Sequence, residues 1–315
     1  MSSNTLHRAS RRRGLSLRTT ENLSLWLMAL PAIVLFLCFA YLPMTGVVLA
    51  FKSFRPKHGI FLSPWVGLKN FEFMFRNATF WMTVRNTLLY NVAFMVIGIV
   101  GPLVFAIALN EVRPKGAARM YQTLTIMPHF VSYVVVSVIV FAILSADSGI
   151  LGNLYKQRGQ QPIAFYSEPK YWPWILSGVY LWKNVGYSSI IFLGTITGIS
   201  DEFYEAAVID GATKWQQIRH ITLPFLKPMV VVLTIMRVGQ MFSSNFDLFY
   251  QVPMNSGQLY SVTNTINVFV YNTLRNSNNV SLSSAVGFVQ SVAGFLLVMG
   301  TNQVIRMIDS DLAMF

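Results

Sequence analysis

The stretch EAAVIDGATKWQQIRHITLPFLKP, Glu205 to Pro228, is polar and amphipathic, yet it lies between two long apolar segments of the chain. Ser200, just before it, is placed to cap a helix whose first turn carries Asp201 and Glu202. Acidic side chains at this position favour a helix, because the N-terminus is the positive end of the helix dipole. A short helix is therefore predicted to begin at Asp201.

A sharp turn is predicted at Asp210 and Gly211, because glycine adopts the positive φ that a reversal of the chain needs. Thr213 and Gln216 have the spacing of a capping box, so a second short helix is predicted to start there. Pro224 would then open the next apolar segment, where a proline in the first turn loses no helical hydrogen bond. The stretch is thus predicted to be a helix-turn-helix at the membrane surface.

Two roles are open for this helix-turn-helix. It can rest on lipid as an interfacial amphipathic helix, or it can dock on a partner protein. Cytoplasmic leaflets are negatively charged and attract basic helices, whereas Glu205 and Asp210 offer carboxylates to a basic partner. The small side chains of Ala206 and Ala207 permit another surface to approach closely. The residues therefore favour docking over lipid.

The composition places the chain in a membrane. It is 54% hydrophobic and 11% charged, and its mean hydropathy is +0.50, which is too apolar for a soluble domain of this length. A helix of about 20 mostly apolar residues crosses about 30 Å of hydrocarbon. We predict an all-α integral membrane fold with six spans, at residues 24–51, 86–110, 120–146, 171–198, 223–246 and 284–305.

Charge near the first span sets the expected orientation. Residues 1–21 form a basic tail with five arginines and one glutamate, which favours the cytoplasmic side. With six spans both termini are then cytoplasmic, residues 22–315 form the transmembrane domain, and the loop at 200–221 is cytoplasmic. The loop at 52–85 carries six Lys/Arg although it is expected outside, which counts against this orientation.

Several function classes are excluded or disfavoured by what the sequence holds. The net charge of +12 is scattered over the tail and the loops, so no nucleic-acid surface is expected. The four histidines are far apart in the sequence, and we assign no metal site and no catalytic set. The chain has no Gly-Lys pair and hence no phosphate loop, so we expect no cofactor bound by this chain. A secondary transporter would need intramembrane acids for coupling, and none is visible.

The polar stretch resembles the EAA loop of ABC importer permeases, whose coupling helices fit a cleft on the ATPase subunit. The residues that match the motif are Glu205, Ala206, Ala207, Gly211, Ile221, Leu223 and Pro224. Further segments resemble, in order, the carbohydrate permeases of the LplB-like polysaccharide transport subgroup, over roughly residues 24 to 305. These segments are YLPMTGVVLAFKSFRP, SPWVGLKNFEFMF, ALNEVR, MPHFVSYVVV, WKNVGYSSIIFLG and IDGATKWQQIRHITLP.

The resemblance implies a subunit of a type I importer in the bacterial inner membrane. Its expected partners are a second homologous permease, two ABC ATPases that bind ATP and magnesium, an extracytoplasmic solute-binding protein, membrane lipid and a carbohydrate substrate. By this resemblance Glu205 and Asp210 contact the ATPase, and Gly211 forms the turn between the coupling helices. A permease for a non-sugar solute remains an alternative, because the EAA loop is shared among importers.

Ionisable side chains inside spans are costly and usually face a cavity or a partner. The candidates for the substrate pathway are Lys183, Asn184, Arg237, Ser244, Asn245 and Asp247. One hypothesis is that Lys183 and Arg237 help an acidic glycan, such as a uronate oligomer of the alginate type, through the membrane. The favoured alternative is that each pairs with backbone carbonyls or the partner permease, or snorkels to an interface. We interpret His129, in the third span, as a packing residue.

Overall fold

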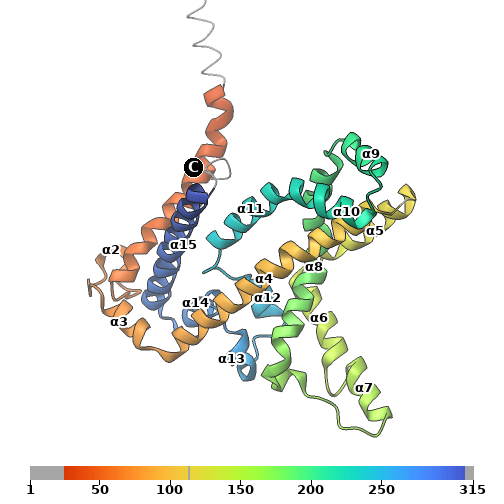
Figure 1. Cartoon of the computed structure of the whole chain (residues 1–315). Coiled ribbons are helices and arrows are strands. Elements are labelled where there is room, and N and C mark those ends of the chain that lie inside the picture. The colour runs from red at the N-terminus through yellow and green to blue at the C-terminus, as the bar shows by residue number, and fades with distance from the viewer. Residues whose placement is uncertain (1–24, 113, 309–315) are drawn as a thin grey trace, which may run out of the picture.

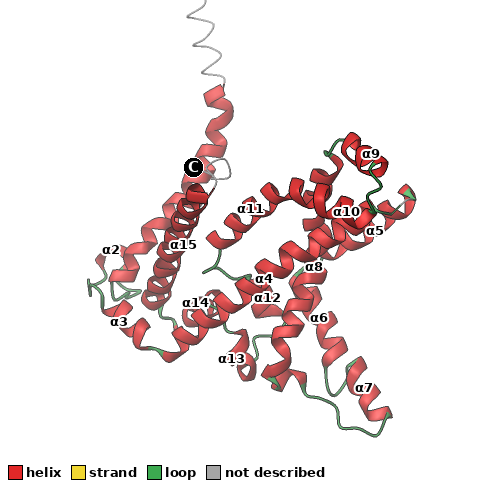
Figure 2. Ribbon diagram, in the orientation of Figure 1, coloured by secondary structure: helices red, strands yellow, loops and turns green. Residues whose placement is uncertain are grey.

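The computed structural model describes residues 25–112 and 114–308. The described residues are helical and form no strand beyond one isolated bridge between Lys52 and Trp65 (Figure 2), which confirms the all-α prediction for this part of the chain. The basic tail predicted at residues 1–21 lies outside the described residues.

The helices lie in the following order along the chain. They are Leu25–Phe51 (with a π turn η1 at Leu37–Tyr41 and a 3-10 segment η2 at Leu42–Phe51), α2 Gly59–Leu62, α3 Lys69–Arg76, α4 Ala78–Asn110, α5 Lys115–Phe130, α6 Tyr133–Leu144, α7 Ile150–Gln157, η3 Phe165–Ser167, η4 Pro169–Tyr171, α8 Trp172–Thr197, α9 Asp201–Ile209, α10 Lys214–Gln217, η5 Ile218–Thr222, α11 Leu223–Gly239, α12 Phe246–Gln251, η6 Gly257–Leu259, α13 Tyr260–Thr263, α14 Ile266–Ser277 and α15 Val280–Ile308.

Four continuous helices in the described residues are long and apolar enough to cross a membrane: Leu25–Phe51, α4, Lys214–Gly239 and α15. The pair α5 and α6 passes the same test together. α8 covers nearly the range predicted for the fourth span, 171–198. α4 starts at Ala78, earlier than the span predicted from 86, because the Asn77 side chain caps it by accepting the Thr79 N–H at 2.9 Å.

The span predicted over 120–146 is not one straight helix. α5 ends at Phe130 and α6 begins at Tyr133, and their axes differ by 100°. Pro128, in the last turn of α5, has no N–H to donate, and the Ser132 side chain accepts the Val135 N–H at 3.3 Å to cap the new helix. A proline followed by an N-cap serine therefore breaks the span.

The span predicted over 223–246 also differs. α11 ends at Gly239, and after residues 240–245 the Asn245 side chain caps α12 by accepting the Leu248 N–H at 3.1 Å. The polar residues at 244–245 therefore end the span instead of continuing it, since the Ser244 hydroxyl donates to Thr265 Oγ1 and the Asn245 side chain caps α12.

α8 is the central helix, because it packs against α4, α5 and α11. The Phe94 ring of α4 stacks on Tyr180 of α8 with centroids 4.1 Å apart. At Gly186 of α8 an added Cβ would lie 2.2 Å from the carbonyl oxygen of Thr125, so the crossing with α5 requires glycine there. In Figure 1, α9 and α10 lie at one end of this bundle, and α7 projects from the opposite end.

Candidate coupling surface and membrane cavity

The predicted helix-turn-helix is present. The Ser200 side chain accepts the Glu202 N–H at 3.4 Å at the start of α9, and Gly211 has φ +78° at the turn. Thr213 and Gln216 form the capping box, with the Thr213 N–H donated to Gln216 Oε1 at 2.7 Å. The local structure of the polar stretch therefore follows from its own capping residues.

The second helix of this element runs directly into a membrane helix. α10, a π turn at Ile218–Thr222 and α11 form one helix from Lys214 to Gly239, 26 residues long. This differs from the sequence prediction, in which the span opens separately at Pro224. A proline ring crowds the carbonyl four residues earlier, here His220, and the wider π turn accommodates it without ending the helix.

The surface of the helix-turn-helix is suited to a protein partner. Ile209 is 86% exposed and Trp215 67%, and the carboxylates Glu205 and Asp210 are exposed near them. Exposed apolar side chains rimmed by polar ones mark interaction sites. Its mixture of apolar and acidic groups matches the docking interpretation.

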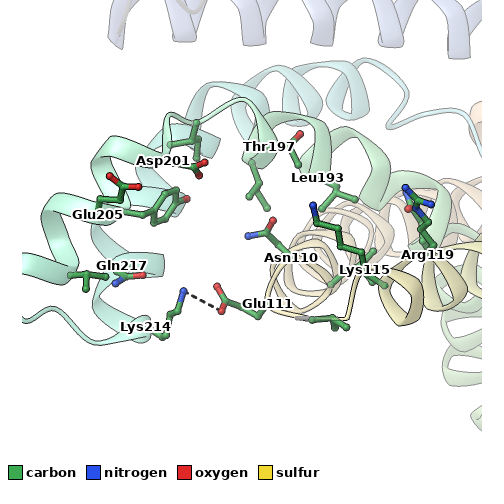
Figure 3. A pocket seen from close by; sticks show the side chains of 18 of the residues that line it. Asn110, Glu111, Lys115, Arg119, Leu193, Thr197, Asp201, Glu205, Lys214 and Gln217 are labelled. Carbon is green, nitrogen blue, oxygen red and sulfur yellow. Dashed lines mark ion pairs between the residues drawn. The ribbon is translucent and has the colours of Figure 1, made fainter.

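A groove of about 1160 Å³ separates α9 and α10 from the end of α4 and the first turns of α5 (Figure 3). Asp201 and Glu205 line one side of it, and Lys115 and Arg119 lie across from them. Lys214 Nζ lies 3.5 Å from Glu111 Oε2 and bridges the two walls. Glu205 thus faces the groove as well as solvent.

A second cavity, of about 440 Å³, lies at the break between α5 and α6. It brings together four of the six predicted pathway residues: Lys183, Asn184, Asn245 and Asp247. Asn184 Nδ2 donates to the Tyr180 carbonyl at 2.8 Å, which fixes the amide against its own helix. The cavity therefore combines residues of α5, α6, α8 and α12 that are far apart in the sequence.

The Lys183 side chain is bound by backbone carbonyl groups at the break between α5 and α6. Its ammonium donates to the carbonyl oxygens of His129 at 2.7 Å, Pro128 at 3.1 Å and Val131. Its side chain is buried, with 6% of the residue exposed, and it lies 4.9 Å from the Tyr133 ring centroid. An ammonium has three N–H donors, so all three are used by backbone carbonyls. For Lys183 the favoured alternative, pairing with carbonyls, is confirmed.

Arg237 and Ser244 lie apart from this cavity. The Arg237 guanidinium donates to the Tyr180 hydroxyl at 2.6 Å and to the Gly98 carbonyl at 3.5 Å. The Ser244 hydroxyl donates to Thr265 Oγ1 at 2.8 Å. The structure therefore gives Arg237 protein partners within this chain, as it does for Lys183.

Six further residues line the cavity, the continuous run from His129 to Val134, which includes Ser132 and Tyr133. Asn245 Nδ2 donates to the Tyr133 hydroxyl at 3.1 Å, and the His129 ring stacks on Tyr187 with centroids 4.0 Å apart. The stacking confirms the packing role expected for His129, although the residue also lines the cavity. Among the described residues no group of three or more His, Cys, Asp or Glu side chains is placed to hold a metal ion.

The family model described as "Binding-protein-dependent transport system inner membrane component" matches residues 98–298. The chain belongs to this family of membrane permeases. It is 34% identical over 287 residues to Protein LplB of Bacillus subtilis (strain 168), with 91% of this chain and 90% of that protein covered. The resemblance expected from the sequence is thereby confirmed.

Two further comparisons involve proteins of polysaccharide transport. The chain is 33% identical over 301 residues to the polygalacturonan/rhamnogalacturonan transport system permease protein YteP of Bacillus subtilis (strain 168), covering 96% of this chain and 93% of that protein. Its fold matches a chain from the crystal structure of a bacterial ABC transporter involved in the import of the acidic polysaccharide alginate. That match has a TM-score of 0.84 and 30% identity, and covers 94% of this chain and 99% of the other.

Proposed function

We propose that the chain is one permease subunit of an ATP-driven importer of oligosaccharides or polysaccharides, and that acidic uronate polymers are the preferred class. The two relatives that handle polygalacturonan, rhamnogalacturonan or alginate support this class, because these polymers carry carboxylates. The observation on which the proposal rests is the polar cavity of about 440 Å³ between α5, α6, α8 and α12, which is within the size range of small-molecule sites.

The side chains of this cavity suit a sugar. The amides of Asn184 and Asn245 and the hydroxyl of Tyr133 provide donors and acceptors for sugar hydroxyl groups. Lys183 uses its donors internally, but its positive charge remains at the wall and attracts carboxylates through space. Asp247, on another part of the wall, partly offsets this field.

The six-span topology is part of the proposal. Four continuous helices, the bent pair α5 and α6, and α8 together make six crossings. An even number of spans and a basic tail at residues 1–21 support a proposed orientation with both termini in the cytoplasm of a bacterial cell and the chain in the inner membrane. In Figure 1, the start of the first helix and the end of α15 lie at the end of the molecule that also holds α9 and α10, which supports this orientation.

The ATPases that drive transport are proposed to contact this chain at α9 and α10. Two ABC ATPases would hold ATP and magnesium, since the sequence has no phosphate loop. One ATPase would dock on the exposed surface formed by Glu205, Ile209, Asp210 and Trp215, with Ala206 and Ala207 allowing close approach. A second homologous permease completes the pathway, and a binding protein delivers substrate from outside, as the family's description suggests.

The experiment is ATP hydrolysis by the whole complex in liposomes, with its binding protein, while neutral and acidic oligosaccharides are added in turn. Stimulation by oligouronates and not by neutral chains is the expected result. Stimulation by neutral chains alone would contradict the acidic preference. No response to any sugar, from a complex that still hydrolyses ATP, would favour the alternative of a non-sugar solute.

A further inference from the structure

Arg237 joins three membrane helices at one point. Its guanidinium bonds to the hydroxyl of Tyr180 on α8 and reaches the carbonyl of Gly98 on α4, while Arg237 itself lies in the last turn of α11. A Cβ at Gly98 would lie 2.8 Å from the Tyr180 hydroxyl and 3.2 Å from Arg237 Nη2. The absence of a side chain at Gly98 therefore allows this junction to form.

The helix that carries Arg237 begins in the helix-turn-helix at residues 200–221, which we call the coupling loop for its proposed role. Lys214 to Gly239 is one continuous helix, and 23 residues of rise separate Lys214 from Arg237, or roughly 35 Å. The π turn at Ile218–Thr222 and Pro228, features at which helices can bend, lie within this helix and do not divide it, so a displacement of α10 at the ATPase side is expected to displace Arg237 as well.

On the other side of the junction, Tyr180 is one turn from the cavity. Tyr180 and Lys183 are three residues apart on α8 and thus on one face, and the Asn184 side chain bonds to the Tyr180 carbonyl. Lys183 in turn holds the carbonyls of the α5/α6 break, which forms the cavity wall at His129 to Val134. Contacts are therefore unbroken from the coupling loop to this wall.

We infer that Arg237 is a positioning residue that transmits motion of the α10–α11 helix, through Tyr180 and α8, to the cavity wall. The inference rests on the proposed transport function. It assigns Arg237 no direct contact with the substrate. In the described part of the chain no carboxylate lies within ion-pair distance of Arg237, so the hydroxyl of Tyr180 is its closest polar partner.

Two substitutions isolate this contact. Arg237→Met removes the donor, and Tyr180→Phe removes the hydroxyl that accepts but keeps the ring that stacks on Phe94. The matched control is Lys227→Met, which removes an exposed positive charge from the same helix. The first readout is the ratio of substrate-stimulated to basal ATP hydrolysis by the reconstituted complex, because a general loss of folded complex leaves this ratio unchanged.

The second readout needs no sugar. In a Cys38→Ser background, which removes the chain's one native cysteine, Val134→Cys places a thiol on the cavity wall. The rate of its labelling by a water-soluble maleimide is measured with and without ATP and vanadate. The difference in labelling rate shows whether the cavity wall changes when the ATPases bind ATP. This readout does not depend on the substrate class.

Each single variant is expected to reduce the ATP-dependent change and the stimulation ratio by about tenfold, the effect of losing one charge-assisted hydrogen bond. The double variant is also expected to lose about tenfold and not about a hundredfold, because both substitutions remove one interaction. If Arg237→Met prevents assembly, Tyr180→Phe alone tests the inference. Three results would overturn the inference. The first is a double variant whose loss is the product of the two single losses, and the second is single variants within about twofold of the Lys227→Met control. The third is a complex with unchanged Arg237 and Tyr180 in which the labelling of Val134→Cys does not change with ATP.

Discussion

Lys183→Met tests whether the membrane lysine holds the α5/α6 break. Methionine has nearly the length of lysine but no N–H donor, so the substitution keeps most of the packing and removes the hydrogen bonds. The carbonyl oxygens of His129 and Val131 lose their donor in a region where Lys183 is 6% exposed, whereas that of Pro128 still accepts the Val131 N–H at 3.2 Å.

The expected loss follows from the carbonyls of His129 and Val131. A buried polar group left unpaired costs about 1 to 3 kcal/mol, and water in the adjoining cavity favours the lower end, so the two together cost about 2 kcal/mol. With about 2 to 4 °C of melting temperature for each kcal/mol, the midpoint is expected to fall by about 4 to 8 °C. Lys227→Met, at an exposed site, is expected to change it by less than about 2 °C.

The assay is thermal unfolding of the detergent-solubilised complex, followed as the loss of its peak in size-exclusion chromatography after heating. A midpoint of Lys183→Met within about 2 °C of the Lys227→Met control would refute the structural role. Unchanged uptake of every acidic sugar by a stable Lys183→Met variant would separately refute any contribution of its charge to transport.

Three further predictions concern the coupling loop and the central helix crossing. Gly211→Val is expected to strain the turn by about 1 to 2 kcal/mol at φ +78° and to lower sugar-stimulated ATP hydrolysis, whereas Gly211→Asn, which tolerates this conformation, should retain it; equal activities would contradict the turn argument. Glu205→Lys should weaken copurification of the ATPase, and full copurification with normal transport would argue against docking through this carboxylate. Gly186→Ala should destabilise the complex by about 1 to 3 kcal/mol because its Cβ meets the Thr125 carbonyl at 2.2 Å, while Gly178→Ala on the same helix, with open space, should not; similar melting of both would refute the close crossing.

The coupling loop could be predicted closely because local signals determine it. The Ser200 cap, the positive φ of Gly211 and the capping box of Thr213 with Gln216 each act within a few residues, so the sequence contains all the interacting groups. The apolar runs likewise located most of the membrane helices, because hydropathy is a property of each segment alone.

The break at residues 131–132 was missed, although Pro128 and Ser132 together were a signal for it. The uninterrupted apolar run from 120 to 146 predicts one span, whereas the missing donor of Pro128 and the capping tendency of Ser132 indicate a helix end between them. The partners of Lys183 and Arg237 could not be derived, because they depend on which helices meet in three dimensions. The carbonyls lie 52 to 55 positions from Lys183 in the sequence, and the Tyr180 hydroxyl lies 57 positions from Arg237. The residues next to Lys183 and Arg237 in the sequence therefore do not indicate these partners.

The most direct test of the proposed function is uptake itself. The permease pair, its ATPases and the binding protein are reconstituted in liposomes, and a labelled oligouronate is supplied on the binding-protein side. ATP-dependent accumulation inside the liposomes, abolished when the ATPases are omitted, is the expected result. No accumulation of any oligosaccharide above the ATP-free control, by a complex with intact ATP hydrolysis, would contradict it.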